Sequence, residues 1–303
     1  MSSTKNGWML PSFELLEPKT LRDASCLLAR YGDDAKVLAG GTDLFVQMRN
    51  GKVSPKYMIS LMRIRDLDYL RYEEKAGLRI GATCAIRSLE KSSIVKQAYR
   101  AVHEAAYSVG TVQVRNMATL AGNICNASPA ADMAPPLMVF GAELEIVGRD
   151  GKKSVALENF FTGPKKTALA RDEVLAEIRL PDPPLHSGSA FLKISRTGSD
   201  LAKINGAAML VVHGGVCIDV KIALGAVAST PIRVTGSERT LKGKRLEDSL
   251  LEKTADIAVD EISPISDVRS SEEYRRQVSK ILVKRMLRAA LERIDCVPGG
   301  KAI

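Results

Sequence analysis

The sequence predicts a protein of the α+β class, and three regions with different patterns of apolar residues support this. Residues 13–41 show a strand, helix, strand pattern. Residues from about 59 to 180 contain alternating apolar strands joined by hairpin turns, and residues 190–303 begin with three strands and end in helices. A single strand–helix–strand unit followed by hairpins and a helical tail is typical of the α+β class.

The first region predicts a small lobe of about residues 1–58 with a parallel sheet. Thr20 precedes an apolar helical pattern and Asp23 stands three residues later, which is a variant of the capping box, and Gly32 follows as a helix stop. The short strands that flank this lobe's glycine loop are KVLA at 36–39 and YMIS at 57–60. Ligands of α/β units bind at the carboxyl ends of such strands.

The second region predicts a lobe of residues 59–180 that is mainly antiparallel sheet. One hairpin turns near residues 75–77, and another, residues 143–157, contains the turn signal Asp150-Gly151. Residues 88–109 show a helical pattern, and residues 173–180 form a closing strand. We also expect a helix start at Ser128, with Pro129 at the first helical position.

A linker, PDPPLHSGS at 181–189, separates these lobes from a C-terminal domain, residues 181–303. Three predicted strands follow at 190–196, 203–215 and 216–227, and the chain is helical from Glu247. We expect the last helix to begin after Ser270, with Glu273 completing a capping box. Its predicted apolar stripe consists of Tyr274, Val278, Ile281, Leu282 and Leu291.

Composition argues against several classes of partner. The chain has 303 residues and a formal net charge of +9, but its basic residues are dense only in 269–293, without alternating aromatic side chains for base stacking. The longest apolar run, at 206–215, is too short to span a bilayer. The five cysteines form no close pair, which is typical of reduced thiols. We therefore expect no nucleic acid, no membrane span and a cytoplasmic location.

Two glycine motifs carry the chemical signal. In VLAGGTDL, residues 37–44, a strand runs into Gly40 and Gly41, which allow a tight turn with bare N–H groups. Such groups can cradle an anion, usually phosphate, although an ordinary tight turn is the commoner explanation of a lone Gly-Gly. The second motif, Thr119 to Asn123, repeats a hydroxyl, a glycine and a short polar side chain. Two such loops can clasp one pyrophosphate without a lysine, and Asp132 can accept hydrogen bonds from hydroxyl or ring N–H groups.

Four stretches resemble, in order, the FAD-binding subunit of molybdenum hydroxylases, the family of xanthine dehydrogenase and carbon monoxide dehydrogenase. They are VLAGGTDL at 37–44, TVQVRNMATLAGNICNASPAAD at 111–132, AFLKISRTGSDLAKINGA at 190–207 and DVRSSEEYRR at 267–276. The resemblance covers roughly residues 10–294. It implies a vanillyl-alcohol-oxidase-type (PCMH-type) FAD-binding domain of two lobes, residues 1–180, and a C-terminal domain of the CO dehydrogenase flavoprotein type.

The resemblance also implies which residues contact FAD. In the family, the first loop lies along the pyrophosphate of FAD, and the second motif lies opposite that loop. Single residues before and after the linker also contact FAD. The implied positions are Val37, Leu38, Ala39, Gly40, Gly41, Thr42, Asp43, Leu44, Val109, Thr119, Leu120, Ala121, Gly122, Asn123, Asp132, Leu175 and Lys193. For Leu175 a purely structural place in the core, and for Lys193 a solvated strand position, are equally open.

Two departures from the family pattern matter. Ala121 stands where many relatives have a second glycine, and Val109 stands where some have an aromatic residue. The four-cysteine cluster that 4-hydroxybenzoyl-CoA reductase carries in this subunit has no counterpart here. The implied function is electron transfer: a molybdopterin-binding large subunit and a 2Fe-2S small subunit deliver electrons to FAD, which passes them to NAD+ or another acceptor.

Two other functions remain open from the sequence alone. A stand-alone FAD-dependent oxidoreductase of similar fold would need its own acid–base or covalent flavin residue, and no histidine or cysteine is convincingly placed for that role. A non-catalytic binding protein would use the basic surface for an anionic partner. Flavin colour in the purified chain separates the enzymes from the binding protein, and metal in a co-purified complex separates the two enzymes.

Overall fold

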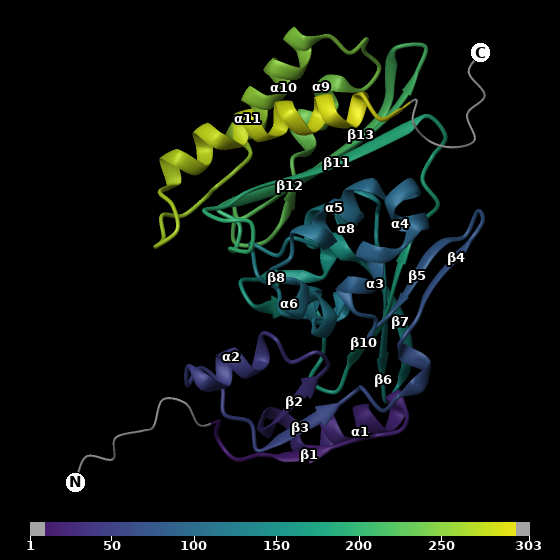
Figure 1. Cartoon of the computed structure of the whole chain (residues 1–303), viewed down its shortest axis with the longest axis vertical. Helices are drawn as coiled ribbons and strands as arrows, with labels where there is room; N and C mark the ends of the chain where they lie inside the picture. The colour runs from purple at the N-terminus through teal and green to yellow at the C-terminus, as the bar shows by residue number, and fades with distance from the viewer. Residues whose placement is uncertain (1–9, 295–303) are drawn as a thin grey trace.

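The computed structural model describes residues 10–294, which fold around three main sheets that follow one another along the long axis of the molecule (Figure 1). The N-terminal sheet lies at one end, a five-stranded sheet with short helices lies in the middle, and the C-terminal sheet with its helices lies at the other end. This arrangement confirms the predicted α+β class.

The first sheet is parallel, with the order β1-β3-β2, as the strand–helix–strand pattern predicts. Its elements are β1 (Glu14–Leu16), α1 (Leu21–Tyr31), β2 (Ala35–Leu38), α2 (Leu44–Arg49) and β3 (Tyr57–Ser60). The Thr20 hydroxyl accepts a hydrogen bond from the Asp23 N–H, and Gly32 ends α1 with φ +52°. Because β3 pairs as far as Ser60, the first lobe extends slightly past residue 58.

The second sheet is antiparallel, with the order β4-β5-β10-β6-β7. Its strands are β4 (Leu70–Glu73), β5 (Gly77–Gly81), β6 (Glu143–Gly148), β7 (Gly151–Ala156) and β10 (Val174–Leu180). Both predicted hairpins are confirmed, and the second turns at Arg149 and Asp150, since Gly148 pairs with Gly151. A small hairpin that the pattern did not predict, β8 (Phe161–Gly163) with β9 (Lys166–Thr167), precedes β10.

Short helices cover this sheet, and the helical pattern predicted over 88–109 is confirmed, although it is divided among three of these helices. The helices are α3 (Ile86–Lys91), α4 (Ser93–Ala98), α5 (Arg100–Ser108), α6 (Val112–Met117), α7 (Leu120–Cys125) and α8 (Ala134–Val139). The chain breaks at Ser92, whose hydroxyl caps α4 by accepting from the Val95 N–H, and again at the buried Tyr99. The predicted start at Ser128 and Pro129 is wrong, because the Ser128 carbonyl closes a turn with Ala131 and α8 begins at Ala134.

The C-terminal domain is a four-stranded antiparallel sheet with helices packed on one face (Figure 1). Its elements are β11 (Ser187–Ile194), β12 (Ile204–His213), β13 (Val216–Gly225), β14 (Ile232–Arg233), α9 (Thr235–Leu241), α10 (Asp248–Asp260) and α11 (Glu272–Leu291). Three short 3-10 turns complete the described part, at Gly32–Asp34, Arg65–Leu67 and Leu157–Asn159. The predicted linker is shorter than expected, since Ser187–Ser189 belong to β11.

The details of α11 differ from the prediction. Its N-cap is Ser271, which accepts from the Tyr274 N–H, while the Ser270 N–H instead bonds to Asp267. Tyr274 and Ile281 of the predicted stripe are exposed, at 40% and 49%. The buried face is set by the sheet beneath and consists of Arg275, Ser279, Leu282, Val283, Met286, Leu287 and Ala290.

Two hydrophobic cores hold these layers together. One core runs continuously through the first two lobes and includes Phe191 and Met209 of the third sheet, and the other lies between the third sheet and its helices. The first two lobes therefore fold as one unit around residues that both contribute. No helix within residues 10–294 is long and apolar enough to cross a membrane.

Candidate functional site

Gly40 brings the first glycine loop against the backbone that precedes the second motif. A Cβ atom added to Gly40 would lie 1.8 Å from the carbonyl oxygen of Met117 and 3.0 Å from the Cα of Ala118. No side chain fits there, so this glycine permits the close approach of the two lobes. Gly41 has φ +71°, a conformation that disfavours any other residue. The first glycine loop thus lies against the residues directly before the second motif, although the two are far apart in the sequence.

The loop between β2 and α2 presents unused backbone donors. Within the described part of the chain, the N–H groups of Gly40, Gly41, Thr42 and Asp43 donate to no carbonyl or side-chain oxygen. The carbonyl oxygens of Gly41 and Asp43 are used, because they accept from Phe45 and Gln47 at 3.0 Å. A turn whose N–H groups are free while its carbonyl groups are occupied is suited to an anion.

The second motif is the first turn of helix α7 rather than a loop. The Thr119 hydroxyl oxygen accepts from the Gly122 N–H at 3.0 Å, which leaves the hydroxyl proton available as a donor. The Ala121 N–H donates to no carbonyl group within the described residues. The Asn123 Oδ1 atom is buried and has no hydrogen-bond partner among the described residues. Leu120 and Ala121 are themselves buried, and Ala121 takes a helical position that accommodates its Cβ.

Lys165 adds a cation that the sequence reasoning missed. It lies in the turn between β8 and β9, and its Nζ donates to Asn126 Oδ1 at 2.9 Å. Burial of the ammonium group lowers the pKa of Lys165, the Asp43 carboxylate opposes this shift, and the cations Lys52 and Arg269 reinforce it. The expectation of a site without any lysine is therefore incomplete. The sequence did not indicate Lys165, because the hairpin turn that carries it has no recognisable signal.

We expect Lys165→Met to weaken FAD binding by about tenfold or more, because a charge-assisted contact to phosphate contributes roughly 1.5–3 kcal/mol. The matched control is the neighbouring Lys166→Met. Lys166 is exposed on β9, and its substitution removes the same charge from the chain. Fluorescence titration of FAD into the flavin-free chain measures both. Equal affinities of the two variants would show that Lys165 does not serve the cofactor. Affinity should also decline at alkaline pH below the usual lysine range, because Lys165 with its lowered pKa loses its charge early.

A second cluster surrounds Asp132, which is buried, with 7% of its surface exposed. Its Oδ2 atom accepts from Lys193 Nζ at 2.7 Å, and its Oδ1 atom accepts from Asn205 Nδ2 at 2.7 Å. Lys193 also donates to the carbonyl oxygen of Ser108 at 3.0 Å. The cluster thus joins the end of α5, the turn before α8, and strands β11 and β12. Lys193 is a buried partner of Asp132, so its alternative as a solvated strand residue is wrong.

The electrostatics of this cluster favour a ligand with hydrogen-bond donors. Burial raises the pKa of Asp132, and the charge of Lys193 and the hydrogen bonds from Lys193 and Asn205 act against that shift. Asn205 is completely buried, and its Oδ1 atom has no partner among the described residues. The sequence signal for Asn205 was an amide inside the otherwise apolar stretch 204–212, a position that polar residues rarely occupy without a partner.

The segment from Asn126 to Asp132 links the two clusters and is held by the C-terminal domain. The Pro129 carbonyl oxygen accepts from the N–H of Ala226 at 2.7 Å, and Ala226 has φ +62°. Arg275 is 3% exposed and donates to the Ala226 carbonyl oxygen and to Asp267 Oδ1, both at 2.7 Å. The stretch 267–276 therefore fixes a strained turn that supports the segment carrying Asp132.

The remaining predicted positions lie near the clusters or in the core. Val109 follows Ser108 directly, and its carbonyl oxygen accepts from Arg115 at 3.0 Å. Leu175 is 2% exposed on β10 and belongs to the core of the first two lobes. The contacts of Leu175 are those of a core residue, and they supply no polar group to a ligand.

The residues present fit FAD. The free N–H groups of the first loop, the first turn of α7 and Lys165 suit a pyrophosphate. The unpartnered oxygens Asn123 Oδ1 and Asn205 Oδ1 suit hydroxyl or ring N–H donors of the same cofactor. No group of three or more His, Cys, Asp or Glu side chains within residues 10–294 is arranged to hold a metal ion.

Comparison with known proteins agrees with this geometry. Residues 11–183 match the family model for the FAD binding domain in molybdopterin dehydrogenase, and residues 189–290 match that for the CO dehydrogenase flavoprotein C-terminal domain. The chain is 32% identical to the carbon monoxide dehydrogenase medium chain of Afipia carboxidovorans, over 94% of this chain and 99% of the relative. It is 33% identical to the xanthine dehydrogenase FAD-binding subunit of Escherichia coli O157:H7, over 93% and 96%.

A solved structure shows the same fold. Carbon monoxide dehydrogenase from Hydrogenophaga pseudoflava superposes with a TM-score of 0.91 at 33% identity, covering 94% of this chain and 99% of the other. The matching family models, the relatives and the paired glycine motifs together assign the protein. This chain belongs to the FAD-binding medium-chain subunits of the xanthine dehydrogenase and CO dehydrogenase family of molybdenum hydroxylases.

Proposed function

We propose that this oxidoreductase subunit relays electrons from a 2Fe-2S subunit to NAD+ or another acceptor. FAD supplies the redox chemistry when bound, and the chain holds it, orients it and limits its access to solvent. The contact of Gly40 with Met117 carries the proposal, because it joins two lobes at a cradle of free N–H groups. In this proposal the cradle binds the pyrophosphate, and the Asp132 cluster contacts the flavin end.

We further propose two partner chains, a molybdopterin-binding large subunit and a 2Fe-2S small subunit, in a cytoplasmic heterotrimer or its dimer. The relatives named as medium chains of carbon monoxide dehydrogenase support this, since a medium chain is one part of a larger enzyme. We also propose a division into an FAD-binding domain, residues 1–180, and a C-terminal domain, residues 181–303, and the limits of the two matching family models, 11–183 and 189–290, support it.

Purification of the assembled enzyme from its source tests this proposal. The chain should co-purify with two other polypeptides, and the complex should contain molybdenum, iron, acid-labile sulfide and FAD. Addition of NAD+ to the substrate-reduced complex should reoxidise the flavin, and a parallel trial with a quinone and with oxygen identifies another acceptor. A chain that purifies alone and reduces its own flavin with a substrate would overturn the proposal.

We expect the isolated full chain to contain FAD but no iron–sulfur cluster. The cysteines lie on separate elements, and Cys296 lies outside the described residues. Burial raises the pKa of Cys84 and Cys217 to about 11 and that of Cys125 to about 12, which disfavours the thiolates that ligate iron. Acid precipitation should release the flavin as free FAD, and iron and sulfide assays should be negative. Stoichiometric iron, or flavin retained on the pellet, would contradict this.

The stand-alone flavin oxidoreductase is not favoured by these contacts. His103 is an imidazole whose pKa burial lowers, and His186 and His213 contact each other at the end of the C-terminal sheet. None of the three contacts the glycine motifs or the Asp132 cluster. None of the three histidines is therefore placed to act as an acid–base residue at the flavin.

A further inference from the structure

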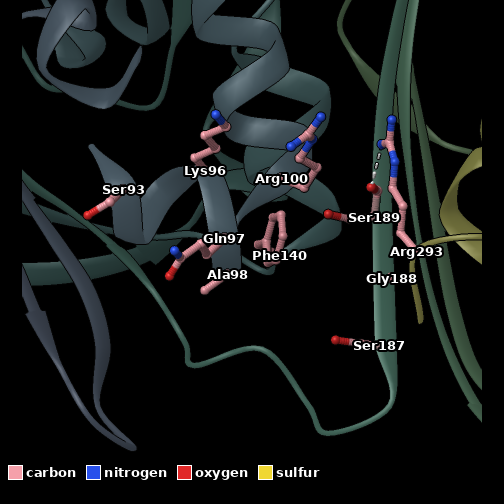
Figure 2. A pocket seen from close by; sticks show the side chains of 10 residues that line it. All are labelled: Ser93, Lys96, Gln97, Ala98, Arg100, Phe140, Ser187, Gly188, Ser189 and Arg293. Atoms are coloured by element: carbon pink, nitrogen blue, oxygen red, sulfur yellow. Dashed lines mark hydrogen bonds between the residues drawn. The ribbon is translucent and has the colours of Figure 1, made fainter. Parts of the chain in front are cut away.

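A cavity of about 520 Å³ lies between the second lobe and the C-terminal domain, apart from both glycine motifs. Figure 2 shows its two walls, with Ser93, Lys96, Gln97 and Arg100 on the helical side and Ser187, Ser189 and Arg293 on the strand side. Phe140 lies between the two walls. The helical wall is α4 and the start of α5, and the strand wall is the start of β11.

The cavity carries excess positive charge. Arg100 and Arg293 share one carboxylate, Glu104, with N–O distances of 3.2 and 2.8 Å. Lys96 is exposed and forms no ion pair within the described residues. Three cations against one acid attract an anion. Arg293 contacts both oxygens of Glu104, but Arg100 donates only its Nε and retains its other N–H groups for a second carboxylate.

The strand wall supplies a neutral donor. The Ser189 hydroxyl oxygen accepts from the Ala101 N–H at 3.2 Å, so its proton is available to a ligand. Ser187 does not serve in this way, because its hydroxyl donates to the Pro184 carbonyl oxygen at 2.6 Å. Ser189 is 6% exposed, and its position is fixed by β11, whose Gly188 lies directly against α11. The donor is thus held rigidly at the inner part of the cavity.

The inner part of the cavity is apolar. Phe140 is 3% exposed and packs its ring against Tyr99, while Ala98 and Gly188 offer no polar side chain. Cavities of this volume that combine an apolar interior with a few polar groups are typical sites for small organic molecules. Inorganic anions alone would leave the apolar surface uncovered.

We propose that this cavity binds a small aromatic carboxylate. Its carboxylate lies against Lys96 and Arg100, and its ring lies against Phe140. Helix α5 and strand β11 line this cavity at one end. Further along, they carry Ser108 and Lys193 of the Asp132 cluster, so the ligand and the cluster lie along the same pair of packed elements.

Titration calorimetry of the full chain with bound FAD tests the proposal, with 2-naphthoate as the probe. A ligand of this size is expected to bind with a dissociation constant of about 1 mM. Lys96→Gln and Arg100→Gln should each weaken binding about tenfold. Lys253→Gln, which removes an exposed lysine of α10 that lies outside the cavity and forms no ion pair among the described residues, should leave binding unchanged.

Two further measurements separate this site from non-specific adsorption. The neutral 2-naphthamide should bind at least about tenfold more weakly than the acid, because it lacks the charge. Ala98→Trp should abolish binding by filling the cavity, with flavin content unchanged. The proposal fails if 2-naphthoate does not bind at 10 mM, if all three charge variants bind alike, or if the amide equals the acid.

Discussion

Replacing Gly40 with alanine is expected to abolish FAD retention. The added Cβ would lie 1.8 Å from the Met117 carbonyl oxygen, far inside van der Waals contact, and the clashing atom belongs to the backbone. The two lobes must then separate, which opens the space between the first loop and the first turn of α7. Flavin absorbance per chain after gel filtration measures the loss, and we expect less than about a tenth of the wild-type content.

A second glycine gives the control for this substitution. A Cβ added to Gly198 would meet no atom of the described residues within 4 Å, and Gly198 has no positive φ, so Gly198→Ala should keep full flavin content. Gly41→Val and Gly122→Val should also lose FAD while leaving a folded chain, because Gly41 has a positive φ and a Cβ on Gly122 would lie 2.8 Å from Thr119 Oγ1. Wild-type flavin content in Gly40→Ala would show that the contact of the two motifs has no part in cofactor binding.

Replacing Asp132 with asparagine is expected to destabilise the flavin-free chain by about 3–5 kcal/mol. The substitution leaves the Lys193 ammonium buried without its carboxylate, and the amide of Asn205 loses a charged acceptor. Urea denaturation followed by circular dichroism measures the free energy of unfolding. A loss below about 1 kcal/mol would show that the pair is open to water.

The double variant Asp132→Asn with Lys193→Met separates structure from cofactor binding. It leaves no buried charge at the pair, so most of the stability should return, since burial raises the pKa of Asp132 and already disfavours its charged form. If Asp132 contacts the flavin, FAD content should stay low in the stable double variant. Full FAD content there would assign Asp132 a purely structural role.

The sequence determined the features that depend on local chemistry. Thr20, Gly32 and the hairpin around Asp150 are predictable because caps and turns use contacts within a few residues. Apolar stretches predicted the longer strands of all three sheets for the same reason, but not the two-residue β14. The four ordered motifs identified the family, and the matching family models confirm it.

Local patterns misjudged positions where tertiary packing decides. The helical pattern of residues 88–109 gives no sign of its breaks, but Ser92 caps a new helix and Tyr99 is buried where the chain bends again. Tyr274 and Ile281 continue an apolar helical stripe, yet the sheet contacts the neighbouring face that contains Arg275. A helix has several similar faces, and only the surface beneath it selects the buried one.

The candidate site was predicted as motifs, but its chemistry depends on residues brought together by folding. The contact of Gly40 with Met117 joins positions 77 residues apart, because a backbone approach leaves no pattern in either stretch. Lys165, Asn205 and Arg275 come from three separate elements, and each acts through a partner that is distant in sequence. Hydrogen bonds and burial of charge depend on distance in space, so the tertiary structure alone decided which polar side chains surround the cofactor site.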